Sequence, residues 1–116
     1  MRVTKGRQKH QARLDEIQFW GKDLARRARR KCELCEGDTD LRIYDGDPDA
    51  EPGLATLVLA CERCRAVLEG RSDDERTLRF LETAIWNEEP IIAQLAKRML
   101  AEVDAAWARE ALDMVS

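Results

Sequence analysis

Histidine, aromatic residues and long apolar runs are all scarce in this sequence of 116 residues. The one histidine, His10, lies in a polar and basic segment, so we expect no metal or catalytic role for it. Aromatic residues make up 5% of the chain and charged residues 37%, which predicts a modest core that needs additional support. Even the longest apolar runs, such as residues 57–60, fall far short of the ~20 residues that span a bilayer, which excludes a transmembrane role.

A secretory signal is also lacking, because the basic residues 1–9 are not followed by the apolar stretch of about 7–15 residues that such a signal requires. The sequence therefore predicts a cytoplasmic protein without a membrane partner. Its length suits a single domain, residues 1–116, which excludes a multidomain enzyme. In a reducing cytosol, cysteines rarely form structural disulfides, which leaves metal ligation, redox chemistry or burial for the four cysteines.

The cysteines form two C-x-x-C pairs, Cys32 with Cys35 and Cys61 with Cys64, separated by 25 residues. This spacing lets each pair turn two thiolates toward one metal ion, and four soft thiolates select zinc. Iron in a rubredoxin-like centre is the competing occupant, because the same tetrahedron of sulfurs suits it. A thioredoxin-like redox motif needs one C-x-x-C in a βαβ unit, which this pattern does not match. With all four positions filled by protein sulfur, we expect one structural Zn²⁺ ion and no catalytic metal.

Charge is divided unevenly along the chain. Residues 1–31 hold eleven Lys and Arg against three acids, a net charge of +8, whereas residues 32–116 carry −11. The cations nearest the first cysteine pair are candidate contacts to the phosphates of nucleic acid or to an acidic protein partner: Arg26, Arg27, Arg29, Arg30 and Lys31. Alternatively, this segment packs on its own acidic body or neutralises the tetrathiolate, whose charge with zinc is about −2. The sequence leaves both readings open.

Hydrophobic periodicity predicts an α+β fold. Residues 41–44 and 56–60 have the apolar and β-branched character of two hairpin strands, and residues 65–69 predict a short helix that ends at Gly70. The expected organisation is a disordered basic tail (1–9), a basic helix with a bend at Gly21 (10–31), a zinc finger (32–70) and a helical C-terminal part (71–116).

The C-terminal part is expected to contain two helices. Ser72 and Glu75 form an S-x-x-E capping box that predicts the start of a helix, and Pro90 ends it. Beyond Pro90, a continuous apolar stripe predicts a last helix of more than twenty residues that either packs within the chain or forms a homodimer. The stripe consists of Ile92, Leu95, Met99, Val103 and Trp107, and we expect the tryptophans Trp20, Trp86 and Trp107 mainly in the core.

The order of a helix, a C-x-x-C knuckle, a hairpin and a second C-x-x-C opening a helix resembles a treble-clef zinc finger. Residues 30–35 resemble the start of its HNH endonuclease version. That resemblance implies a histidine base, an asparagine and a second histidine at places occupied here by Asp45 (or Tyr44), Thr56 and Arg65. The three catalytic identities are missing, so we predict no enzyme. A degenerate HNH-type, metal-dependent phosphoesterase that uses Asp45 is the rival hypothesis.

Five segments carry a second resemblance: C-E-L-C at 32–35, Ile43-Tyr44-Asp45, the apolar strand into C-x-x-C at 57–64, Ile85 to Pro90, and Ala96 to Leu100. Together they resemble the N-terminal zinc-binding region of the PhnA-type proteins, named after the alkylphosphonate utilisation operon, over roughly residues 26–103. We therefore predict a non-catalytic zinc-binding protein that acts as a binding or adaptor module. Its partner is nucleic acid, through the basic segment, or alternatively protein only.

Overall fold

A computed structural model of the chain describes residues 5–72 and 74–115, with side chains from residue 10 onward. The elements of this α+β fold, in chain order, are α1 (Lys5–Phe19), α2 (Gly21–Ala28), β1 (Arg42–Asp45), β2 (Leu57–Ala60), α3 (Glu62–Leu68), the 3₁₀ turn η1 (Glu75–Thr77), α4 (Leu81–Ala84), α5 (Pro90–Ala101) and α6 (Ala106–Val115). Among the described residues, no helix combines the length and the apolar character needed to cross a membrane.

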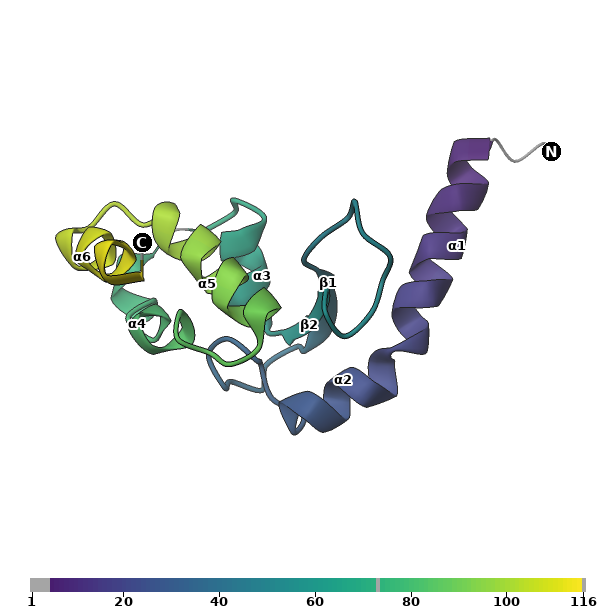
Figure 1. Cartoon of the computed structure of the whole chain (residues 1–116), viewed down its shortest axis with the longest axis horizontal. Helices are drawn as coiled ribbons and strands as arrows, with labels where there is room; N and C mark the ends of the chain where they lie inside the picture. The colour runs from purple at the N-terminus through teal and green to yellow at the C-terminus, as the bar shows by residue number, and fades with distance from the viewer. Residues whose placement is uncertain (1–4, 73, 116) are drawn as a thin grey trace.

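The molecule is elongated, with extents of 53 × 28 × 26 Å. Helices α3 to α6 gather at one end, the hairpin of β1 and β2 lies in the middle, and α1 stands apart at the other end (Figure 1). Helix α2 runs beneath the hairpin and joins α1 to the body (Figure 1). The first cysteine pair follows α2, so α2 and the knuckle are adjacent in space as well as in sequence.

The two predicted strands are confirmed to within one residue at each end. They pair antiparallel, with Arg42 opposite Ala60 and Asp45 opposite Leu57. Every residue of β2 is buried, whereas β1 is half-buried or exposed, because α2 and α5 pack on β2. The order α2, knuckle, hairpin and α3 is the predicted one, and the treble-clef assignment stays a prediction.

The N-terminal segment differs from the prediction of one helix over residues 10–31. The chain forms α1 and α2, and they are separated at Trp20, beside the glycine at which a bend was expected. Helix α2 ends at Ala28, because Arg29 and Arg30 adopt left-handed backbone angles, with φ of 55° and 57°. Helix α1 begins at Lys5, inside the tail that was predicted to be disordered, and residues 1–4 of that tail lie outside the described part of the chain.

The expectation of a last helix longer than twenty residues is wrong. Helix α5 ends at Ala101, and α6 folds back against it (Figure 1). A single straight helix would leave the end of its apolar stripe in water, whereas the break buries Val103, Ala108 and Ala111 in one core with α5. The apolar stripe that suggested a homodimer is thus largely used inside the chain.

The predicted capping box at Ser72 is also wrong. Asp74 is the N-cap, and its carboxylate accepts a hydrogen bond of 3.2 Å from the backbone N–H of Arg76. A 3₁₀ turn and the separate short helix α4 follow instead of one helix. Trp86 lies beyond the end of α4 and is 59% exposed, so the prediction that it belongs to the core is wrong.

Candidate metal centre

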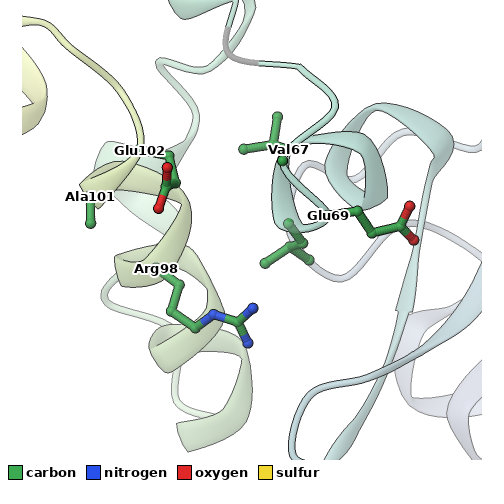
Figure 2. A pocket seen from close by; sticks show the side chains of 7 residues that line it. Val67, Glu69, Arg98, Ala101 and Glu102 are labelled. Carbon is green, nitrogen blue, oxygen red and sulfur yellow. The ribbon is translucent and has the colours of Figure 1, made fainter.

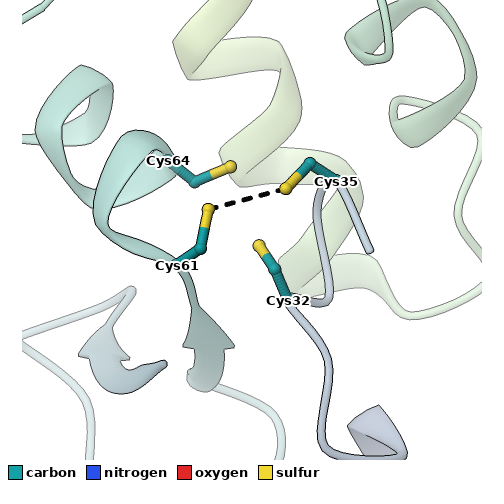
Figure 3. A group of neighbouring side chains, drawn as sticks. All are labelled: Cys32, Cys35, Cys61 and Cys64. Atoms are coloured by element: carbon teal, nitrogen blue, oxygen red, sulfur yellow. Dashed lines mark hydrogen bonds between the residues drawn. The ribbon is translucent and has the colours of Figure 1, made fainter. Parts of the chain in front are cut away.

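The two C-x-x-C pairs come together at the junction of the knuckle and α3. Cys61 is the N-cap of α3 and Cys64 lies in its first turn, while Cys32 and Cys35 come from the loop after α2 (Figure 3). All four Sγ atoms lie within 4.8 Å of one another, and Cys35 Sγ is 3.5 Å from Cys61 Sγ. A tetrahedral zinc ion with Zn–S bonds of about 2.3 Å places its sulfurs about 3.8 Å apart. The four cysteines are therefore close enough to coordinate one metal ion.

The first knuckle is closed by the backbone around its cysteines. The N–H of Cys32 donates to the carbonyl of Gly37 over 2.6 Å, and the N–H of Glu36 donates to the carbonyl of Cys32 over 2.8 Å. The N–H of Gly37 then donates to Cys35 Sγ over 3.3 Å, a bond that favours the thiolate. A Cβ atom at Gly37 would lie 3.3 Å from the same sulfur, so a residue without a side chain suits this position.

The crowding of the four sulfurs shapes their protonation. A hydrogen bond with Cys35 raises the pKa of Cys32 to about 11. Hydrogen bonds with Cys32 and Cys35 raise the pKa of Cys64, whereas hydrogen bonds with Cys32 and Cys64 lower the pKa of Cys35. Several thiolates so close together repel one another in a buried site, and a bound dication removes that repulsion. Four thiolate donors therefore suit a dication such as Zn²⁺, and they would fill all of its coordination positions.

Arg63 supplies a positive charge beside the sulfurs. Burial alone would lower the pKa of Arg63, but its hydrogen bond to Cys35 and the charge of that thiolate raise it. The guanidinium carbon lies 5.0 Å from the centroid of the Phe80 ring, which fixes the side chain by a cation–π contact. The sequence analysis assigned neutralisation of the thiolates to the cations before the first knuckle and missed Arg63. Its position between Cys61 and Cys64 could have indicated that it lies beside the sulfurs.

Glu33, between the first two cysteines, connects the knuckle to both α2 and β2. Its carboxylate is 3% exposed and accepts two hydrogen bonds from Arg27, of 2.6 and 3.0 Å. It also accepts the backbone N–H of Leu59 at 2.9 Å. Arg27 donates in addition to the carbonyls of Leu54 and Leu57, and the hydrogen bond with Glu33 is the main reason that its pKa is raised. Arg27, one of the five predicted nucleic-acid contacts, thus forms its bonds within the chain.

The remaining predicted cations stay on the surface. Arg26, Arg29, Arg30 and Lys31 are exposed, and the side chain of none forms an ion pair or a hydrogen bond with the described part of the chain. Lys22, which the prediction did not include, lines an open groove of about 540 Å³ together with three of them. We call the set Lys22, Arg26, Arg29, Arg30 and Lys31 the basic face of α2.

Comparison with known proteins does not add to this picture. No family model, curated protein or solved structure matches this chain. The resemblances to the PhnA-type proteins and to HNH zinc fingers therefore stay predictions that rest on the residues quoted above. The structure itself shows an α+β chain in which four cysteines can hold one metal ion.

Two positions that match the HNH base site are held by arginines. The carboxylate of Asp45 accepts the Nε–H of Arg13 at 3.0 Å, and Arg13 Nη2 also donates to the backbone carbonyls of Asp47 and Ala50. The neighbouring Tyr44 hydroxyl lies 3.4 Å from Arg98 Nη2, which donates to it. Arg13 therefore attaches α1 to Asp45 at the end of β1 and to the hairpin loop that follows.

The other two HNH-matched positions also form internal bonds. The Thr56 hydroxyl donates to the carbonyls of Glu51 and Gly53 within the hairpin loop. Arg65 is buried and donates to the carbonyl of Ala60 and to the carboxylate of Asp40, whose pKa it lowers. Among the described residues, the four cysteines form the only group of metal-ligating side chains close enough for one ion. The HNH-matched positions therefore bring no second metal cluster.

A separate pocket of about 380 Å³ lies between α3 and α5 (Figure 2). Val67 lies on one side of it and Arg98, Ala101 and Glu102 on the other, while the carboxylate of Glu69 points away from α5 (Figure 2). Its lining contains no cysteine, histidine, serine or threonine that could act as a nucleophile with an adjacent base. The described lining of this pocket therefore does not indicate a catalytic site.

Proposed function

We propose that this protein is a non-catalytic zinc-binding module that binds nucleic acid through the basic face of α2. The observation that supports it most directly is the cluster of surface cations on and just after α2, none paired with an acid in the described chain. Five neighbouring positive charges repel one another, and a phosphate backbone relieves that repulsion while releasing its condensed counterions.

The zinc site would serve this function by fixing the position of α2. The bonds between Arg27 and Glu33 attach α2 to the knuckle, so the cations of the basic face keep a defined orientation to the metal centre. The left-handed turn at Arg29 and Arg30 directs the chain from α2 into the first cysteine pair. Zinc bound by four thiolates has no open position for water or substrate, so its contribution is structural.

Duplex DNA titration tests the proposal. If the basic face neutralises about four phosphates, the slope of log K against log salt is expected to be about −4. The triple variant Arg26→Glu, Arg29→Glu and Arg30→Glu is expected to lose binding and keep its zinc, because none of these residues is a ligand. Arg27 is left unchanged, since its side chain holds the fold.

A charge-matched control separates local from overall charge. Arg71, Arg76 and Arg109 are exposed cations outside the basic face, and their triple change to Glu alters the net charge by the same amount. This control is expected to retain most of the affinity. Equal loss in both variants, or no affinity at about 50 mM salt, would contradict the proposal and favour a module that binds proteins only.

Nuclease assays test the rival enzyme hypothesis. We expect no cleavage of DNA or RNA with added Mg²⁺ or Mn²⁺, because the carboxylate of Asp45 is bonded to Arg13 and lacks a histidine partner. Asp45→Ala is expected to weaken the attachment of α1 without changing this result. Metal-dependent cleavage that Asp45→Ala abolishes would make the degenerate HNH phosphoesterase the leading hypothesis.

A further inference from the structure

An open groove of about 740 Å³ runs beside the first knuckle and has one exposed tryptophan in its wall. Trp86 and Phe80 supply its aromatic surface, and Cys35 lies in its lining. Glu36, Glu88 and Glu89 are also in the lining. We call this feature the acidic groove.

The negative charge of the acidic groove is largely unmatched. Among the described residues, Arg27 is the one cation in its lining, and its guanidinium is already bonded to Glu33. Arg63 lies beside the groove, where it stacks on Phe80 and is bonded to Cys35. Glu36 and Glu88 form no ion pair with the described residues, and Glu89 lies 3.9 Å from Arg27. An exposed indole ring in one groove with the unpaired carboxylates of Glu36 and Glu88 suits a cationic side chain that stacks on the ring and pairs with the acids.

The acidic groove and the basic face of α2 are neighbours. A smaller groove of about 310 Å³ lies between them, and its lining includes Arg29 and Lys31 from one side and Glu36 and Glu89 from the other. Positive and negative surfaces therefore lie side by side, yet these cations do not reach these acids within one chain. Each half keeps its charge available to another molecule.

We infer that a second copy of this chain docks here, with the basic face of each copy in the acidic groove of the other. A two-fold rotation about the border between the two surfaces places the basic face of each copy on the acidic groove of the other. Such a symmetric pair of identical contacts is an isologous interface. A partner of one charge would match only half of this surface. The charge pattern on the chain itself therefore selects a second copy over a basic peptide or an acidic protein.

Trp86 is the expected centre of this interface. Arginine stacked on an indole ring and surrounded by carboxylates is a frequent strong contact between proteins. The interface does not depend on the C-terminal stripe, which is largely buried within the chain. It shares the basic face with the proposed nucleic-acid contact, so self-association and nucleic-acid binding are expected to compete.

Sedimentation analysis of the zinc-loaded, nuclease-treated full chain tests this inference. We expect a reversible dimer whose dissociation constant rises about tenfold between roughly 0.05 and 0.5 M salt, because salt screens the charge pairs. The basic-face variant Arg26→Glu with Arg30→Glu should be monomeric, and so should the acidic-groove variant Glu36→Lys with Glu88→Lys. An equimolar mixture of the two should form a heterodimer, because both contacts then pair opposite charges.

Trp86→Ala provides a test that leaves all charges in place. It should weaken the dimer at least about tenfold, whereas Met114→Ala, which removes another exposed apolar side chain, this one from α6, should leave it unchanged. A wild-type chain that stays monomeric at about 0.05 M salt, or a variant mixture that fails to associate, would overturn the inference. The Glu36→Lys, Glu88→Lys variant should still bind DNA, so failure of the dimer and failure of nucleic-acid binding are distinguishable.

Discussion

Removing zinc from the purified protein is expected to unfold it. Apparent zinc binding of about 10–16 kcal/mol is as large as the whole ~5–15 kcal/mol stability of a small domain. Cys32 and Cys64 are fully buried in the same core as Val58 and Leu95, so four charged or crowded thiols without a metal would disrupt that core. Elemental analysis should find one zinc per chain, and circular dichroism should lose its helical signal when a chelator removes it.

Ligand replacement should reproduce the effect of the chelator. Cys61→Ser removes one corner of the tetrahedron and the N-cap sulfur of α3, and is expected to give a zinc-deficient, unfolded chain. His10→Ala is the matched control and should keep both zinc and fold, since His10 is exposed. A chain that stays folded without metal would contradict the prediction. A coloured protein that contains one iron per chain would show that the metal is iron and not zinc.

The second large effect is expected at Glu33. Glu33→Ala leaves the guanidinium of Arg27, 17% exposed, without its carboxylate, and leaves the N–H of Leu59 without an acceptor. Removing one partner of a buried ion pair costs about 3–5 kcal/mol. Urea denaturation of the zinc-loaded protein should show this loss in the free energy of unfolding.

An exposed pair is the control for Glu33. Asp104 and Arg109 form an ion pair of 3.0 Å on the surface, so Asp104→Ala should change the free energy of unfolding by less than about 1 kcal/mol. The double variant Arg27→Ala with Glu33→Ala should lose less than the sum of the two single variants, because they share one interaction. If Glu33→Ala costs no more than Asp104→Ala, the carboxylate does not connect the knuckle to α2.

The metal centre and the hairpin could be predicted because their signals are local and chemical. Two C-x-x-C pairs leave few arrangements other than convergence on one ion, and the structure brings the four sulfurs within 4.8 Å. The strands were found because Leu57 to Ala60 form a short apolar run after a loop rich in turn residues.

The helix boundaries were predicted less well, because apolar periodicity does not reveal where a helix turns back on itself. Residues 90–107 keep one stripe in the sequence, yet burying that stripe requires the chain to reverse between Ala101 and Ala106. Trp86 fits the inner face of a helix only if α4 continues to it, and α4 ends first. Both errors come from tertiary packing that overrides a local pattern.

The role of the basic segment could not be decided from composition. In the structure, some of its arginines pair with acids and others do not. Arg13 and Arg27 bind acids of the body, as the packing hypothesis expected. Arg26, Arg29 and Arg30 remain unpaired in the described chain, as a surface for an anionic partner requires. Arginines of the same segment are thus paired or unpaired according to where they lie on α1, on α2 and in the turn after α2.

The attachment of α1 has a consequence for the cooperativity of the fold. No residue of α1 from position 10 onward is buried, and its side-chain hydrogen bonds to the body come from Arg13 alone. Bonds of this kind contribute about 1–3 kcal/mol, well below the ~5–15 kcal/mol that opens a whole domain. We therefore expect helix α1 to detach and reattach many times while the core around the four cysteines stays closed. We thus expect two cooperative units, of which only the larger one contains the four cysteines and responds to removal of a metal.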